Sequence, residues 1–297
     1  MEKLDMSLYV QSGEGANGCS YDMIGNPDVM VKLYNEGYDT STIFTELEVA
    51  EKVFRLGVPS PEPGQIVTDG KRIGIRFRRI TGKRSFSRML ADEPGRVDEF
   101  SREFARYYKG LHSTECPEGL FPDAKEQFLH LLDADRLFTT EQKKVIGDFI
   151  CNVPDCTTAL HGDMHMGNVI STLKPGAPLD SPHNVYFIDL GYFARGCPLF
   201  DMGMLNNICL YADDEFRYHD FHIHADIARK FWDGFVDEYF FGPDKLGEKW
   251  FGKGVDAAAV EKALEPFYAV KMLLVEYNLG GVLPPGAKED IDRIFGF

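Results

Sequence analysis

The chain has 297 residues, of which 44% are hydrophobic and 27% charged, a composition typical of a globular protein with one large domain or two modest ones. Its formal net charge of -15 disfavours a nucleic-acid partner and suits a cationic or neutral small molecule, although solubility is the simpler explanation of the charge. The sequence does not begin like a signal peptide, has no apolar run long enough to span a membrane, and has no CxxC pair among its six cysteines. We therefore expect a cytoplasmic protein with free thiols and no membrane partner.

Residues 1 to about 80 are predicted to be mainly β-strand. Short apolar runs at 29–34 and 72–77 lie between turn residues, which is the usual pattern of strands. One helix is expected between these runs, capped by Thr40, Ser41 or Thr42. Its buried face is predicted from apolar residues at helical spacing: Ile43, Leu47, Ala50 and Phe54.

Beyond Gly82 the chain is predicted to be mostly helical. Long amphipathic patterns predict helices at 97–112, 124–132, 141–150, 223–240 and 257–278. The stretch from Leu160 to Asp189 interrupts them with two short β-like segments around a loop.

These patterns predict two lobes joined by a linker near residues 79–84. The first lobe would span residues 1–81 and the second residues 82–297. A cleft between two lobes is a common place for a ligand.

A glycine-rich run, GEGANG, occupies residues 13–18. The same GxGxxG pattern opens dinucleotide-binding domains, but there a helix follows it, and the turn residues Gly25, Asn26 and Pro27 exclude a helix here. We therefore predict a hairpin whose backbone amides approach phosphate oxygens, because three of its residues lack a Cβ atom. These residues are Gly13, Gly15 and Gly18.

Lys32 lies in the predicted strand at 29–34, and Glu46 lies on the helix that follows. A glutamate at this place can pair with the lysine and hold its ammonium towards the α- and β-phosphates of a nucleotide. Glu48 is the alternative partner. Taken alone, Lys32 would be better interpreted as an exposed strand residue, and the role at the phosphates is favoured only because the motifs downstream follow in the expected order.

The most specific pattern is HGDMHMGN at 161–168, followed by VYFIDLG at 185–191. Asp163 can orient a hydroxyl group and accept its proton, while Asn168 and Asp189 can hold magnesium. A zinc site on His161 and His165 is the alternative, which we disfavour because no further ligand is apparent.

Taken in order, these motifs resemble the aminoglycoside phosphotransferase and choline kinase branch of the protein-kinase-like fold. The run 161–168 is similar to that family's catalytic loop, residues 188–191 (IDLG) to its metal-binding segment, and Asp201 to a structural acid that follows. The resemblance covers about residues 8 to 205. It implies an α+β, bilobal fold with a small β-rich N-lobe carrying one main helix and a larger, mostly helical C-lobe. The N-lobe, 1–81, would bind the nucleotide, and the C-lobe, 82–297, would carry the catalytic loop and bind the acceptor.

The resemblance further implies transfer of the γ-phosphate of ATP, or of GTP, to a hydroxyl of an amino sugar, sugar or amino alcohol, with Mg²⁺ as cofactor. The adenine ring would lie against Arg79 and Ile80, and His161 would support the loop. The chain has no Ala-Pro-Glu element after Asp189, which argues against the alternative of a protein kinase. A non-catalytic pseudokinase is disfavoured because the polar motif residues are all present.

Other polar and aromatic groups have weaker claims to function. Acidic residues surround three histidines at 213–226, and we interpret them as solvated surface rather than as a rim for an amine. The aromatic residues at 231–240 recur at helical spacing and are predicted to pack in the helical lobe. Glu276 and Tyr277 are minor candidates for the acceptor pocket.

Overall fold

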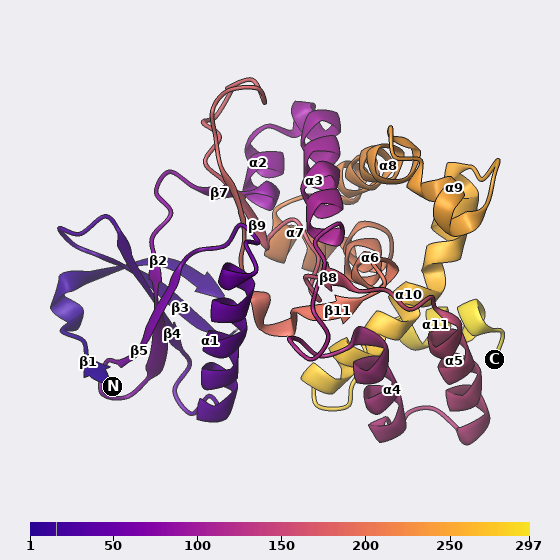
Figure 1. The fold of residues 1–297 in the computed structure, drawn as a ribbon, viewed down its shortest axis with the longest axis horizontal. Helices are drawn as coiled ribbons and strands as arrows, with labels where there is room; N and C mark the ends of the chain where they lie inside the picture. Colours follow the sequence, from indigo (N-terminus) through magenta and orange to yellow (C-terminus); the bar gives the residue numbers. More distant parts are fainter. Residues whose placement is uncertain (16) are drawn as a thin grey trace. The chain divides into compact units, whose positions relative to one another are not determined.

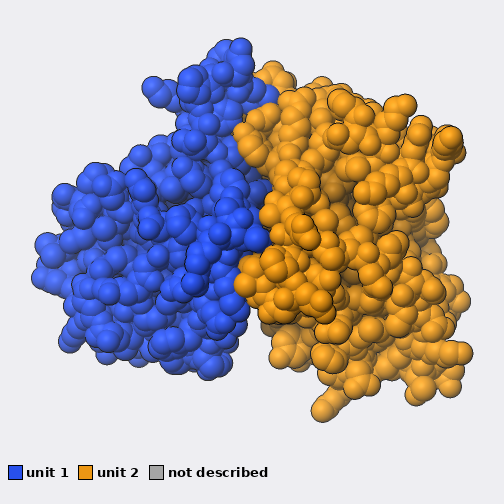
Figure 2. Space-filling view, in the orientation of Figure 1, with its two compact units in different colours: residues 1–84, 169–191 blue, residues 85–168, 192–297 orange. Residues whose placement is uncertain are grey.

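The computed structural model describes residues 1–15 and 17–297, which form two compact units (Figure 2). Unit 1 contains Met1–Arg84 and Val169–Gly191, and unit 2 contains Ser85–Asn168 and Tyr192–Phe297. The first segment therefore ends three residues beyond the predicted division after residue 81. Unit 1 also takes in a stretch that the sequence assigned to the second lobe.

Unit 1 is built on a six-stranded sheet in the order β1-β5-β6-β4-β3-β2. All neighbouring strands are antiparallel except β1, which runs parallel to β5. The strands are β1 (Glu2–Lys3), β2 (Tyr9–Gly15), β3 (Gly18–Met23), β4 (Val29–Tyr34), β5 (Pro63–Thr68) and β6 (Ile73–Arg78), with a short 3₁₀ turn, η1 (Met6–Leu8). The buried side chains of Val31, Leu33 and Val67 form part of its core.

Helix α1 (Thr40–Arg55) contacts β5 and β6 of this sheet (Figure 1). Its N-cap is Asp39, whose carboxylate accepts a hydrogen bond of 3.2 Å from Ser41 N, so the predicted caps at 40–42 were wrong by one residue or more. The predicted burial of Phe54 was also wrong: its side chain is 41% exposed, and Val53 is buried instead. Both positions fit a helical period, and only packing on the sheet decides between them.

A small antiparallel pair, β9 (Val169–Ser171) and β10 (Val185–Phe187), completes unit 1, with β7 (Arg84–Ser85) as its third strand. Phe187 N donates a hydrogen bond of 2.8 Å to Pro59 O. This bond to the segment after α1 explains why a stretch so late in the sequence belongs to unit 1.

Unit 2 is mostly helical, as predicted (Figure 1). Helices α3 and α10 match their predicted ranges to the residue, and α4, α5 and α8 match theirs within two residues at either end. The helices are α2 (Phe86–Asp92), α3 (Val97–His112), α4 (Ala124–Ala134), α5 (Thr140–Asn152), α6 (Leu199–Asn206), α7 (Asp214–Phe221), α8 (Ala225–Phe241), α9 (Leu246–Phe251), α10 (Ala257–Asn278) and α11 (Ala287–Phe295).

Shorter elements connect these helices. A two-stranded antiparallel sheet pairs β8 (Thr158–Leu160) with β11 (Ala194–Gly196). Single turns of 3₁₀ or π-helix lie at η2 (Pro94–Arg96), η3 (Leu190–Tyr192) and η4 (Asn207–Tyr211). The elements that the sequence did not predict are all short, so their hydrophobic periodicity is too brief to recognise.

The core of unit 2 is rich in aromatic side chains. Helix α3 packs on α8, and α10 packs on α6 (Figure 1). The predicted packing role of the aromatic residues at 231–240 is confirmed, because Phe231, Trp232, Phe235, Tyr239 and Phe240 are all buried. Edge-on contacts of Phe104 with Phe231 and Phe235 join the two helices.

The predicted fold class, an α+β protein with one main helix in its β-rich part, is confirmed. Within the described residues no helix is long and apolar enough to cross a membrane. All six cysteines are free thiols, as expected.

Candidate active site

Lys32, on β4, joins two acidic residues of unit 1. Its Nζ donates to Glu46 Oε1 at 2.8 Å and to Asp189 Oδ1 at 2.6 Å. Burial by itself would lower the pKa of the Lys32 ammonium, but the two carboxylates outweigh it and raise that pKa above its usual range. Glu48 pairs with Lys52 instead, so the alternative to Glu46 is resolved.

Asp189 reaches Lys32 from a strained backbone position. Its φ is 55°, in the left-handed region that non-glycine residues rarely adopt. Strain of this kind persists only where the surrounding structure enforces it, and it concentrates at functional sites. The ion pair with Lys32 spans 157 residues of sequence, so tertiary structure alone brings the two groups together.

The glycine-rich run forms the hairpin of β2 and β3, in which Gly15 pairs with Gly18. A Cβ atom on Gly18 would lie 2.2 Å from Leu33 O, so the sheet itself requires glycine there. Gly13 and Gly15 have room for a side chain, since their nearest neighbours would be 3.6 and 3.9 Å away. The hairpin's role towards phosphate stays a prediction, and Ala16 lies outside the described residues.

Arg79 and Ile80 follow β6 and are both half-buried. The Arg79 guanidinium is paired with Asp22, with 2.7 Å between Nη2 and Oδ2. Nothing in this geometry tests the predicted contact with adenine, which stays a prediction.

In unit 2, the loop after β8 is held by a buried acid, Asp201. Its Oδ1 accepts a hydrogen bond from Gly162 N and its Oδ2 accepts one from His161 N, each 2.7 Å long. His112 Nε2 lies 3.0 Å from Oδ2. Burial would raise the pKa of Asp201, but the contacts with His112 outweigh it and lower that pKa. This geometry is that of a structural acid, as the resemblance implied.

At Gly162 the backbone conformation and the close approach of Tyr192 leave no space for a side chain. Its φ is 78°, and a Cβ atom would lie 1.8 Å from Tyr192 O. The close approach fixes the direction in which the chain enters Asp163.

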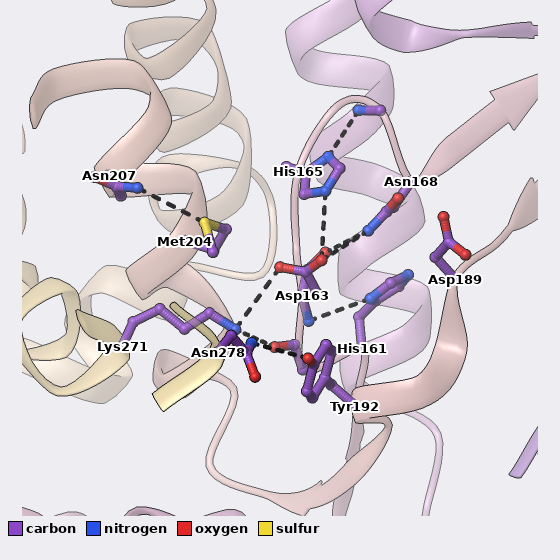
Figure 3. Close-up of polar contacts among 12 residues, drawn as sticks. His161, Asp163, His165, Asn168, Asp189, Tyr192, Met204, Asn207, Lys271 and Asn278 are labelled. Atoms are coloured by element: carbon purple, nitrogen blue, oxygen red, sulfur yellow. Dashed lines mark hydrogen bonds and ion pairs between the residues drawn. The ribbon is translucent and has the colours of Figure 1, made fainter. Parts of the chain in front are cut away.

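Three neighbouring side chains surround the Asp163 carboxylate (Figure 3). Asn168 Nδ2 donates to Asp163 Oδ2 at 3.2 Å and to its backbone oxygen at 3.0 Å, and His165 Nε2 lies 3.5 Å from Oδ2. Lys271 Nζ lies 3.8 Å from Oδ1. Burial would raise the pKa of Asp163, but His165 and the Lys271 ammonium outweigh it and hold that pKa well below its usual range.

Lys271 is a site residue that the sequence analysis missed. It lies on α10, is only 2% exposed, and its Nζ donates to Gly162 O as well as facing Asp163. Burial lowers the pKa of this ammonium, while Asp163 and Asp201 act in the opposite direction. The available signal was a lone lysine within the apolar run 269–274 (AVKMLL).

The side-chain oxygen atoms of Asn168 and Asp189 are suitable ligands for magnesium, which binds amide and carboxylate oxygens. Both described hydrogen bonds of the Asn168 side chain use Nδ2, which leaves Oδ1 for a cation. Asn168 belongs to unit 2 and Asp189 to unit 1, so a shared ion stays a proposal. The zinc alternative gains no support, since residues 1–15 and 17–297 contain no metal-binding group of three or more His, Cys, Asp or Glu.

A cavity of about 420 Å³ opens in unit 2 beside the Asp163 loop. Gly162 and Tyr192 line it, together with residues of α4 and the C-terminal end of α10. Tyr277 is among the lining residues, as the sequence suggested, whereas Glu276 is not.

The acidic residues at 213–226 do not line this cavity. Asp213 caps α7, and Asp214 accepts hydrogen bonds from Ala225 N and His224 Nδ1 at 2.7 and 2.8 Å. The interpretation as local surface structure is therefore favoured over an amine-binding rim.

Comparison with known proteins identifies one protein family and several similar folds. Residues 21–244 match the model of APH, described as a phosphotransferase enzyme family. No curated protein matches the chain.

Several solved structures share the fold over 97% of this chain. A thermostable mutant of aminoglycoside phosphotransferase APH(4)-Ia, in ternary complex with ADP and hygromycin B, is 13% identical with a TM-score of 0.60 over 93% of its length. ADP-bound aminoglycoside phosphotransferase APH(2'')-Ib is 16% identical, with a TM-score of 0.53 over 91%. A microcompartment-associated aminopropanol kinase is 13% identical, with a TM-score of 0.51 over 90%. At these identities the likeness shows the fold alone.

Proposed function

The chain belongs to the phosphotransferase enzyme family, as its motifs suggested, and we propose that it transfers the γ-phosphate of ATP to a hydroxyl group of a small molecule with the help of magnesium. GTP is the alternative donor. The family membership supports a phosphotransferase, and the site residues support a nucleotide as donor and a hydroxyl group as acceptor.

The observation that carries the proposal is the ion triad of Lys32, Glu46 and Asp189. Two carboxylates on one ammonium hold it in place, with 2.8 and 2.6 Å between the charged atoms. A lysine fixed in this way is suited to the nucleotide phosphates, and a carboxylate beside it to their metal ion. The triad is expected to rearrange when nucleotide binds, because phosphate oxygens then compete with Asp189 for the ammonium.

Asn168 and Asp189 are the residues that would hold magnesium. When bound, this ion neutralises the charge that develops on the phosphate oxygens during transfer. Lys32 would orient the phosphates, and Gly13 and Gly15 leave room for phosphate oxygens near the hairpin backbone.

Asp163 would align the acceptor hydroxyl for in-line attack. Its low pKa makes it a weak base, which fits a loose transition state in which the hydroxyl proton leaves late. His165 and Asn168 hold the carboxylate in one orientation, and orientation supplies much of the rate in phosphoryl transfer. Lys271 would act as a positioning residue through Gly162 and Asp163.

The cavity beside Gly162 is the proposed acceptor site. Its volume of about 420 Å³ suits a small molecule rather than a protein segment. One solved structure with a similar fold holds ADP and hygromycin B together, so this fold accommodates a nucleotide and a small hydroxylated compound at once.

Asp163→Asn tests the proposal with little change in shape. We expect ADP release with a panel of charged and uncharged hydroxyl compounds to fall by about 10²- to 10⁴-fold, while the rise in melting temperature caused by ATP and magnesium is retained. Asp148→Asn, an exposed acid of α5, is the matched control. Full turnover by the Asp163→Asn protein, or a wild-type protein that ATP does not stabilise, would refute the proposal.

A further inference from the structure

We propose that the acceptor is an uncharged alcohol that also carries an aromatic or other flat apolar ring. The inference rests on the proposed function and concerns the cavity of about 420 Å³ beside Gly162. It selects the neutral one of the two kinds of acceptor, cationic or neutral, suggested by the net charge of -15, because the walls of the cavity differ in chemistry from the surface as a whole.

The walls of the cavity are mainly apolar. Helix α4 contributes Phe128 and Leu131, α10 contributes Leu274, and Phe200 of α6 closes another side. The polar groups among the lining residues are largely neutral, as in Gln127 and Asn278. Such groups form hydrogen bonds to hydroxyls, while the apolar walls favour a ring.

The carboxylate on the cavity wall is already engaged with groups of the protein, His112 among them. Asp201 is the only acid among the described residues that line it. Both of its oxygens already accept hydrogen bonds, Oδ1 from Gly162 N and Oδ2 from His161 N. An ammonium group in this cavity would lose water without gaining an ion pair, which is unfavourable.

Two tyrosines present their rings at the cavity. The side chains of Tyr192 and Tyr277 line it and are 39% and 64% exposed, so neither ring is fully covered by protein. Asn278 Nδ2 donates to Tyr192 OH at 2.8 Å, which fixes the orientation of that ring (Figure 3). A fixed, partly exposed ring is a suitable surface for stacking a flat ligand.

The cavity leads to the proposed catalytic group. Gly162, which lines it, directly precedes Asp163, and Lys271 Nζ lies 5.7 Å from the centre of the Tyr192 ring and 3.8 Å from Asp163 Oδ1. Asp163 and Lys271 themselves are not among the lining residues. A ligand bound in the cavity therefore lies next to the loop that carries Asp163.

Two probes of equal size test the charge preference: 2-(2-naphthyl)ethanol and 2-(2-naphthyl)ethylammonium, titrated into the full chain without nucleotide by calorimetry. We expect the alcohol to bind about tenfold more tightly, since the ammonium must give up its hydration without a partner. Absence of alcohol binding, or equal or tighter binding of the ammonium, would overturn the inference.

Two variants, each with a matched control variant, locate the binding. Tyr277→Ala should weaken binding of the naphthyl alcohol several-fold, whereas Tyr218→Ala, which removes another exposed tyrosine, should not. Gln127→Glu places a carboxylate on the cavity wall and should strengthen ammonium binding up to about fivefold. Asn152→Asp adds the same charge to an exposed position of α5 outside the lining residues and should have no such effect. Equal effects of variant and control in either pair would contradict the assignment to this cavity.

The acceptor inference and the proposed function fail in different ways. If ATP with magnesium does not raise the melting temperature, the proposed function is wrong whatever the naphthyl probes do. If ATP stabilises the chain but the ammonium probe binds as well as the alcohol, only the uncharged acceptor is refuted.

Discussion

Lys271→Met tests whether the buried lysine of α10 supports Asp163. The substitution removes an ammonium 3.8 Å from Asp163 Oδ1 and leaves an apolar side chain of similar length. It also removes the donor to Gly162 O.

The size of the effect follows from the distance and from burial. Lys271 is 2% exposed on its side chain and Asp163 is 23% exposed, so an effective dielectric constant of about 20 is appropriate and gives about 4 kcal/mol for two unit charges at this separation. This corresponds to at most about 3 pKa units on Asp163. The cost of burying the ammonium offsets part of this energy. The free energy of unfolding should therefore change by less than the charge interaction alone would give, whereas the pKa of Asp163 reports that interaction directly.

The pKa of Asp163 should therefore rise from its lowered position towards that of an ordinary aspartate. The acidic limb of the pH profile of kcat/KM should move to higher pH, and kcat should fall by roughly 10- to 100-fold because the carboxylate is less well placed. Carbon NMR of the Asp163 carboxyl would measure the pKa directly. Lys262→Met, an exposed lysine of the same helix, is the matched control.

Stability provides a second readout with a definite sign. Burial lowers the pKa of Lys271, so between that pKa and the ordinary lysine value of about 10.4 the unfolded chain holds more protons than the native one. Wild-type stability should then rise with pH across this window, and the Lys271→Met protein should lack the rise. An unchanged acidic limb together with unchanged kcat would refute the role given to Lys271.

Three further substitutions, the first with a matched control, test stability and nucleotide binding. Gly18→Ala should cost roughly 1–3 kcal/mol of stability because its Cβ would lie 2.2 Å from Leu33 O. Gly15→Ala, the control, should leave the melting temperature unchanged. Equal melting temperatures for the two variants would contradict the predicted clash at Gly18. Asp201→Asn should lower the free energy of unfolding by roughly 3–5 kcal/mol near neutral pH. Because the pKa of Asp201 is lowered in the native state, this loss should shrink as pH falls below about 4. Urea unfolding at pH 7 and at low pH measures the loss, and a loss that does not depend on pH would contradict a stabilising role of the Asp201 charge. Lys32→Met should abolish the rise in melting temperature caused by ATP, and a retained rise would exclude the ion triad from nucleotide binding.

Much of the fold follows from local patterns in the sequence. The ranges of α3 and α10 were predicted to the residue because each has a long helical repeat of apolar residues, which periodicity reveals without knowledge of the partner. The family resemblance was likewise available, since Asp163, Asn168 and Asp189 lie in short motifs of fixed spacing. Even the order of Lys32 and Glu46 before these motifs could be read directly.

Tertiary structure decided what depends on contacts between distant segments. The sequence left Glu46 and Glu48 as alternatives, and only the packing of α1 on the sheet directs Glu46 towards Lys32. The assignment of residues 169–191 to unit 1 likewise depends on contacts such as the hydrogen bond from Phe187 N to Pro59 O.

Lys271 shows the same limit at the candidate site. It is 109 residues from Gly162, to which it donates, and no local pattern connects the two. The sequence determined which chemical groups are present and their order along the chain, because motifs and helical repeats are short-range. The folded structure determined which groups meet and which are buried. It therefore determined the pKa shifts of Lys32, Asp163 and Lys271 and the mainly apolar walls of the cavity.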